Sequence, residues 1–142
     1  MAEAKTQPTA VTLDEFLTTS VDPTRHADCR AIAAMMQDAT GEPPVMWGKI
    51  VGFGRYEMQY ADGRTGEWPI VGFAPRKTDL TLYITPGFDR LDALLARLGK
   101  HKTGKVCLYI KRLADVDVVV LKAIIDGSVE AMASKRIRVL QS

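Results

Sequence analysis

A stretch rich in glycine and lysine is the part of this sequence closest to a motif of known chemistry. Residues 99–105 read Gly-Lys-His-Lys-Thr-Gly-Lys, which fits the first seven positions of the phosphate-binding loop G-x-x-x-x-G-K-[ST]. The eighth position is Val106, so the hydroxyl group that would hold magnesium is missing. A phosphate-binding loop also lies between a strand and a following helix, whereas here the pattern predicts a helix before and a strand after. The sequence therefore argues against a nucleotide hydrolase.

The same stretch forms a basic turn that has two other uses. Its basic side chains have no acidic residue among them: Lys100, His101, Lys102 and Lys105. They can satisfy the last carbonyl groups of a preceding helix, or they can bind an anion or an acidic partner. His101 has no serine or cysteine close to it in sequence to form an activated pair. Catalytic groups also assemble from distant residues, so an enzyme that uses His101 stays open as an alternative.

Aromatic residues gather in the region predicted to form strands. They are Trp47, Phe53, Tyr56, Tyr60, Trp68, Phe73 and Tyr83. Core packing and cross-strand pairing account for many such residues in sheets. Those that cannot face the helices would line an open groove, and an exposed apolar sheet face favours a ligand pocket or homodimerisation. The candidate ligand-binding residues on this face are Trp47, Tyr56, Trp68 and Tyr83.

Potential metal ligands are few and scattered. The two histidines and two cysteines include no pair with the spacing of a zinc site. Carboxylates alone can bind iron weakly, and three aspartates are candidates: Asp22, Asp28 and Asp38. Arg25 and Arg30 alternate with these acids on the expected main helix, so the residues favour a solvated face of mixed charge over a metal site.

Composition is that of an ordinary globular protein. The chain has 142 residues, 46% of them hydrophobic and 25% charged, and this length predicts one domain. The net charge of +2 does not require nucleic acid as a partner, and no apolar run approaches the roughly 18 residues of a membrane span. Two cysteines do not make a disulfide scaffold. We therefore expect a cytoplasmic protein that binds neither nucleic acid nor a membrane. Residues 1–10 would be a disordered leader and residues 11–142 a single domain.

Apolar residues at helical spacing, together with capping residues, predict the helices. Three of them are expected at residues 12–17, 24–40 and 88–98, with Thr12 as the cap of the first. Asp22 is expected to cap the main helix, with Pro23 at its first position. Asp115 is expected to cap a last helix, whose apolar stripe ends at Met132. Cys29 falls on the apolar face of the main helix and is expected to be a buried, inert thiol.

Between these helices the apolar pattern changes to a period of two, which is typical of strands. Strands are predicted around residues 56–60, 68–74, 80–84 and 106–110. Asp62-Gly63 is a strong turn pair, and short loops between the strands imply antiparallel pairing. Gly52-Phe53-Gly54 indicates a bulge or a close backbone approach. The expected fold is an α+β two-layer sandwich, with a mostly antiparallel sheet packed against about three helices.

Several short motifs, taken in order, resemble the YdhG-like family of bacterial domains, whose function is unknown. They are Val45-Met46-Trp47-Gly48, Gly52-Phe53-Gly54, Leu82-Tyr83-Ile84, residues 98–105 and Asp115-Val116-Asp117. The resemblance covers about Leu13 to Met132 and implies a frataxin-like sandwich. It also implies an iron-chaperone role, suggested for some members, that depends on an acidic ridge. Arg25 and Arg30 interrupt such a ridge here, and the family supplies no agreed catalytic residues.

These observations lead to three functional hypotheses. The leading one is a non-enzymatic binding domain with no cofactor, which holds a small anionic ligand or a protein partner with the aromatic sheet face and the basic turn. The first alternative is a frataxin-like chaperone that binds iron weakly through Asp22, Asp28 and Asp38. The second is an enzyme that uses His101. Each requires the fold to bring residues together that are distant in sequence.

Overall fold

The computed structural model describes residues 9–59, 63, 65–84, 88, 91–104 and 106–133. In these residues the helices are α1 (Leu13–Ser20), α2 (His26–Thr40), α3 (Asp92–Leu98) and α4 (Val118–Ala131), with the 3-10 turns η1 (Pro23–Arg25) and η2 (Leu113–Asp115). The strands are β1 (Val45–Trp47), β2 (Ile50–Phe53), β3 (Tyr56–Gln59), β4 (Thr65–Trp68), β5 (Val71–Pro75), β6 (Leu80–Ile84), β7 (Lys102–Thr103) and β8 (Cys107–Ile110).

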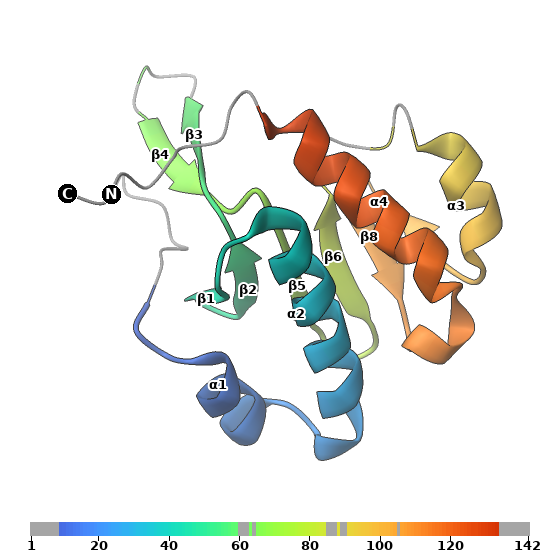
Figure 1. The fold of residues 1–142 in the computed structure, drawn as a ribbon. Helices are drawn as coiled ribbons and strands as arrows, with labels where there is room; N and C mark the ends of the chain where they lie inside the picture. The colour runs from blue at the N-terminus through green and yellow to red at the C-terminus, as the bar shows by residue number, and fades with distance from the viewer. Residues whose placement is uncertain are drawn as a thin grey trace.

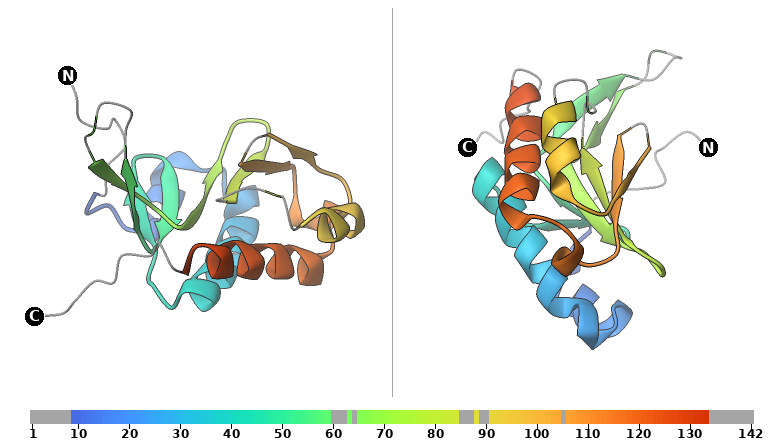
Figure 2. Two further views of the ribbon diagram at one scale, coloured as in Figure 1. Left: turned by 90° about the horizontal axis from the view of Figure 1, so that it is seen from above. Right: turned by 90° about the vertical axis from the view of Figure 1, so that its right-hand side faces the viewer.

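Six of these strands form one antiparallel sheet, in the order β1-β2-β5-β6-β8-β7. Helices α2, α3 and α4 lie together on one face of this sheet, and α1 closes one end of the layer beside α2 (Figures 1 and 2). The predicted α+β two-layer sandwich is therefore confirmed. No helix in the described ranges is long and apolar enough to cross a membrane.

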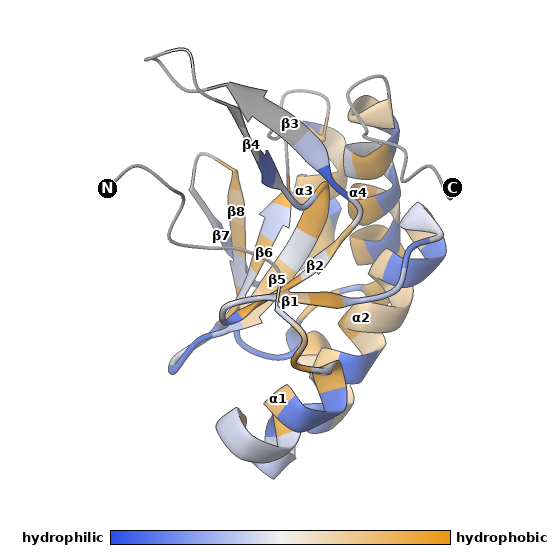
Figure 3. Ribbon diagram, turned by 90° about the vertical axis from the view of Figure 1, so that its left-hand side faces the viewer, coloured by the Kyte–Doolittle hydropathy of each residue, from blue (hydrophilic) through white to orange (hydrophobic). Residues whose placement is uncertain are grey.

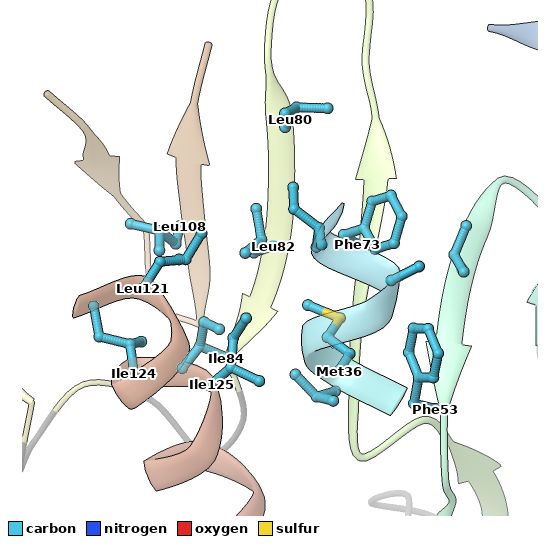
Figure 4. Packing of buried hydrophobic residues seen from close by; sticks show 14 of the residues in the cluster. Met36, Phe53, Phe73, Leu80, Leu82, Ile84, Leu108, Leu121, Ile124 and Ile125 are labelled. Atoms are coloured by element: carbon cyan, nitrogen blue, oxygen red, sulfur yellow. The ribbon is translucent and has the colours of Figure 1, made fainter. Parts of the chain in front are cut away.

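The helices and the sheet meet in one hydrophobic core. Phe73, Leu82 and Leu108 face each other across β5, β6 and β8, and all three are fully buried. Met36 of α2 and Leu121 of α4 reach toward them from the helical layer (Figure 4). Figure 3 shows that hydrophobic residues are concentrated along the central strands. Burial of each such side chain stabilises the fold by about 1.5–3 kcal/mol.

The N-terminal helix begins as the sequence predicts. The Thr12 hydroxyl accepts a hydrogen bond from the Glu15 amide at 3.1 Å, and the Glu15 carboxylate accepts one from the Thr12 amide at 2.9 Å. This reciprocal pair satisfies two amides that would otherwise lack partners. Just before it, the Thr9 amide donates to the Met46 carbonyl of β1 at 2.8 Å. The rest of the predicted leader, residues 1–8, lies outside the described residues.

Two predicted helix caps belong to 3-10 turns instead. The Asp22 carboxylate accepts hydrogen bonds from the amide and hydroxyl of Thr24, at 2.9 and 2.8 Å, and so caps η1; α2 begins only after that turn. Asp115 ends η2, and Asp117 caps α4 by accepting from two amides of its first turn. A capping residue satisfies free amides at the start of either kind of helix, so the sequence signal at Asp22 does not separate the two.

The strand predicted at residues 68–74 is divided in two, which corrects the expectation of one sheet. β4 pairs with β3 in a separate two-stranded sheet, whereas β5 joins the main sheet. Pro69 separates the two strands and has no amide hydrogen to donate to a ladder. Gly54, with φ of 71°, lets the chain turn away after β2. As a result the β3–β4 hairpin projects from the body of the sandwich (Figure 1).

Truncation of the core tests this packing. Leu82→Ala removes a fully buried side chain between the sheet and the helices, and we expect the free energy of unfolding to fall by about 2–5 kcal/mol. Val119→Ala is the matched control, because Val119 is 79% exposed, and it should change stability by less than ~0.5 kcal/mol. Urea denaturation followed by circular dichroism measures both. Equal effects of the two substitutions would contradict the placement of Leu82.

Candidate functional site

The structure separates the candidate ligand-binding residues into two groups. Trp47 lies on β1 at one edge of the main sheet, and Lys102 lies on β7 at the opposite edge. Five interstrand spacings of ~4.8 Å put these edges roughly 24 Å apart. A small ligand therefore does not contact both groups. The aromatic residues and the basic turn have to be considered as two places.

At the β1 edge the aromatic residues pack against one another. Trp47 is only 1% exposed; its ring centroid lies 6.4 Å from that of Trp68, and the guanidinium carbon of Arg55 lies 5.9 Å from it. Gly52 makes room for the indole, since a Cβ there would come within 2.6 Å of Trp47 Cδ1 and 2.7 Å of Pro69 Cβ. The close backbone approach predicted for the Gly52 segment is thus confirmed. Trp47 fills the sheet face that the sequence suggested was an open groove.

The two tyrosines among the candidates have separate surroundings. Tyr56 packs against the main core, and burial raises the pKa of its hydroxyl. Tyr83 lies next to the Trp47 cluster, and its hydroxyl accepts a hydrogen bond from the Arg76 guanidinium at 2.7 Å. Neither side chain lines the hollow described next.

A hollow of about 110 Å³ lies at the other end of the sheet. It is lined by Asp79, Lys100, His101, Lys102, Tyr109, Ile110 and Lys111. Three predicted residues of the basic turn thus share one concave surface, whereas Lys105 lies outside the described residues. Asp79, Tyr109 and Lys111 were not predicted. The alternation of β8 marks Tyr109 as facing away from the core, but no local pattern shows that the turn before β6 lies beside it.

Backbone contacts fix the chain on one side of this hollow. α3 ends before Gly99, as predicted, and the Asp117 amide donates to the Leu98 carbonyl at 2.7 Å. The Lys100 amide then donates to the Asp115 carbonyl at 3.2 Å. Strand β8 follows the glycine- and lysine-rich stretch, as predicted, where a phosphate-binding loop of the nucleotide-hydrolase type has a helix.

The His101 ring has a defined orientation at the rim. Its Nδ1 lies 2.8 Å from the Gly99 carbonyl oxygen. Since a carbonyl only accepts, Nδ1 is the protonated nitrogen and Nε2 is left to interact with other groups. This bond, rather than a lysine ammonium group, satisfies a carbonyl at the end of α3. The described lining of the hollow includes neither a serine nor a cysteine that His101 would activate.

The Asp79 carboxylate is held beside Tyr109. Its Oδ1 accepts from the Thr81 hydroxyl at 3.1 Å, and Thr81 and Tyr109 are directly paired across β6 and β8. A hydrogen bond with Cys107 is the main cause that raises the pKa of Tyr109, and burial and the nearby Asp79 carboxylate add to it. The Tyr109 hydroxyl is therefore engaged with Cys107, while its ring lines the hollow.

The three candidate iron ligands do not converge. Asp28 and Asp38 are ten residues apart on α2, about 15 Å along its axis, and Asp22 caps η1. Asp28 accepts from the Leu113 amide at 3.1 Å, and Asp38 lies 3.0 Å from the Lys122 ammonium group. Over the described ranges, no three histidine, cysteine or acidic side chains form a group able to hold a metal ion.

Comparison with known proteins adds no assignment. No model of a protein family, no curated protein and no solved structure matches this chain. The resemblance to the YdhG-like family, and the frataxin-like iron chemistry that it implies, therefore stay predictions.

The two thiols should differ sharply in reactivity. Cys29 is fully buried, and desolvation raises the pKa of its thiol to about 11, whereas Cys107 is half-buried on the face of the sheet away from the helices. At pH 8 we expect an aromatic disulfide reagent to modify one thiol in the folded protein and both in denaturant. Cys107→Ser should abolish the reaction of the folded protein. Modification of Cys29 under native conditions would contradict its burial.

The close approach at Gly52 leads to a second prediction for this face. Gly52→Ala would press a methyl group against the Trp47 ring and Pro69, and we expect a loss of about 1–3 kcal/mol in unfolding free energy. Gly104→Ala is the matched control, since the nearest atom there is the movable hydroxyl of Tyr109, 3.3 Å away. Thermal unfolding of both variants compares them. A larger loss for Gly104→Ala would contradict the packing described.

Proposed function

We propose that this protein is a non-enzymatic binding domain that holds a small anion in the hollow between β8 and the basic turn. The observation that supports this most directly is the arrangement of Lys100, Lys102 and Lys111. All three line the hollow, all three are exposed, and none forms an ion pair within the part of the chain that the structure describes. Positive groups around a concave surface raise the local potential, which an anion relieves.

These lysines supply hydrogen-bond donors as well as charge. Each exposed ammonium group of Lys100, Lys102 and Lys111 can donate up to three hydrogen bonds. Charge-assisted hydrogen bonds from such donors are roughly twice as strong as those between neutral groups. An anion in the hollow would therefore be both attracted and oriented.

The size of the hollow favours a small ligand over a protein partner. Its volume of about 110 Å³ corresponds to roughly four water molecules at about 30 Å³ each. A phosphate or carboxylate group fits this space, and the rest of a ligand would extend outward.

We propose the cytoplasm as the compartment of this protein, because the free thiols of Cys29 and Cys107 stay reduced there.

Titration with inorganic phosphate tests the proposal. Amide signals of Lys102, Tyr109 and Lys111 should shift together and saturably, because these residues surround the hollow. Lys111→Ala should weaken binding about threefold to tenfold, which corresponds to ~0.7–1.4 kcal/mol. Lys49→Ala is the matched control, since Lys49 is an exposed lysine near the opposite edge of the sheet. Equal weakening by both substitutions, or shifts spread over the whole surface, would contradict the proposal.

A further inference from the structure

We propose that the ligand class of this hollow is the phosphate monoesters of small polyols, and that Asp79 selects them through their hydroxyl groups. This inference rests on the anion-binding function proposed above and makes it more specific. Asp79 puts a carboxylate beside the three lysines of the hollow, where a site for simple anions would have none.

The position of Asp79 is fixed from two directions. Its backbone carbonyl accepts from Arg25 Nη2 at 2.9 Å and from the Arg76 amide at 2.7 Å, so the turn before β6 is tied to the helical layer. Its side chain accepts from Thr81 through Oδ1 alone. Within the described residues, Oδ2 receives no hydrogen bond and no lysine lies within ion-pair distance. One carboxylate oxygen is thus left as an acceptor in the hollow.

The free, negatively charged oxygen of Asp79 repels a bare anion, but it suits a ligand that also carries a hydrogen-bond donor. A carboxylate is an acceptor only, so the complementary group is an N–H or an O–H. An ammonium group would be repelled by Lys100, Lys102 and Lys111 around the same hollow. A hydroxyl group is uncharged, so the lysines do not repel it. Asp79 therefore favours ligands that carry hydroxyl groups besides the anion.

The charge of the lining indicates which anion fits. Three lysines and Asp79 give +3 and −1, a sum of +2. A phosphate monoester carries about −1.5 to −2 at neutral pH and has three acceptor oxygens. A single carboxylate would compensate only part of this charge.

Tyr109 lies between the two parts of such a ligand. In the β8 pairing it stands opposite Lys102 on one side and Thr81 on the other, so it separates the basic turn from Asp79. Its ring offers a flat apolar surface to the carbon skeleton. A phosphate toward Lys102 and hydroxyl groups toward Asp79 would place the polyol along this ring.

Two esters that differ only in hydroxyl groups provide the test. Calorimetric titration at constant ionic strength would compare glycerol 3-phosphate with propyl phosphate. We expect the unmodified protein to bind glycerol 3-phosphate about tenfold more tightly, as one good hydrogen bond to a charged acceptor predicts. Asp79→Asn keeps an oxygen that can accept from Thr81. It should bind propyl phosphate more tightly than the unmodified protein does and reduce the preference to about one. Asp79→Ala, checked for folding by circular dichroism, should also lose the preference.

The outcomes separate the two proposals. Equal binding of the two esters by the unmodified protein would overturn the inference while leaving anion binding intact. A preference that persists in both Asp79 variants would overturn it as well. Failure of inorganic phosphate and both esters to bind would overturn the proposed function, and the inference with it.

Discussion

Alternation along β6 and β8 is the constraint on which the rest of this structure depends. Leu82 and Leu108 point into the core and pair with each other, so the residues beside them must point to the opposite face. Helices α2, α3 and α4 all cover the inner face (Figure 2). Thr81 and Tyr109 are consequently directed to the outer face, opposite each other, by the same register that builds the core. A shift of one residue would exchange the two sets.

The two ends of the outer face of the sheet differ in the side chains that cover them. At the β1 end, Trp68 packs beside Trp47, and Gly52 lets the indole lie directly on the backbone, so this end is closed. At the β7 end there is only a two-residue edge strand, and the charged side chains around Tyr109 leave a hollow. Arg25 links this end to the helical layer through the carbonyl of Asp79. Packing of α2 thus helps to set the shape of the hollow.

Sequence patterns predicted the elements better than their assembly. The cap at Thr12, the end of α3 before Gly99 and the close approach at Gly52 all depend on neighbouring residues, and all three are present in the structure. The separation of Trp47 from Lys102 depends on strand order, which no local pattern encodes. The same is true of Asp79: it is brought beside the basic turn only by the pairing of β6 with β8.

The aspartates proposed for iron and the lysines of the hollow differ in the contacts that they already make. Each aspartate proposed for iron has a structural partner: Asp22 binds Thr24, Asp28 binds the Leu113 amide, and Asp38 pairs with Lys122. Ligation of a metal would have to displace these contacts, and a capped turn or helix contact contributes about 1 kcal/mol each. The lysines of the hollow have no such contact to give up within the described residues. Binding an anion there breaks no described ion pair of these lysines, which is why the hollow, and not the acidic residues, supports the proposed function.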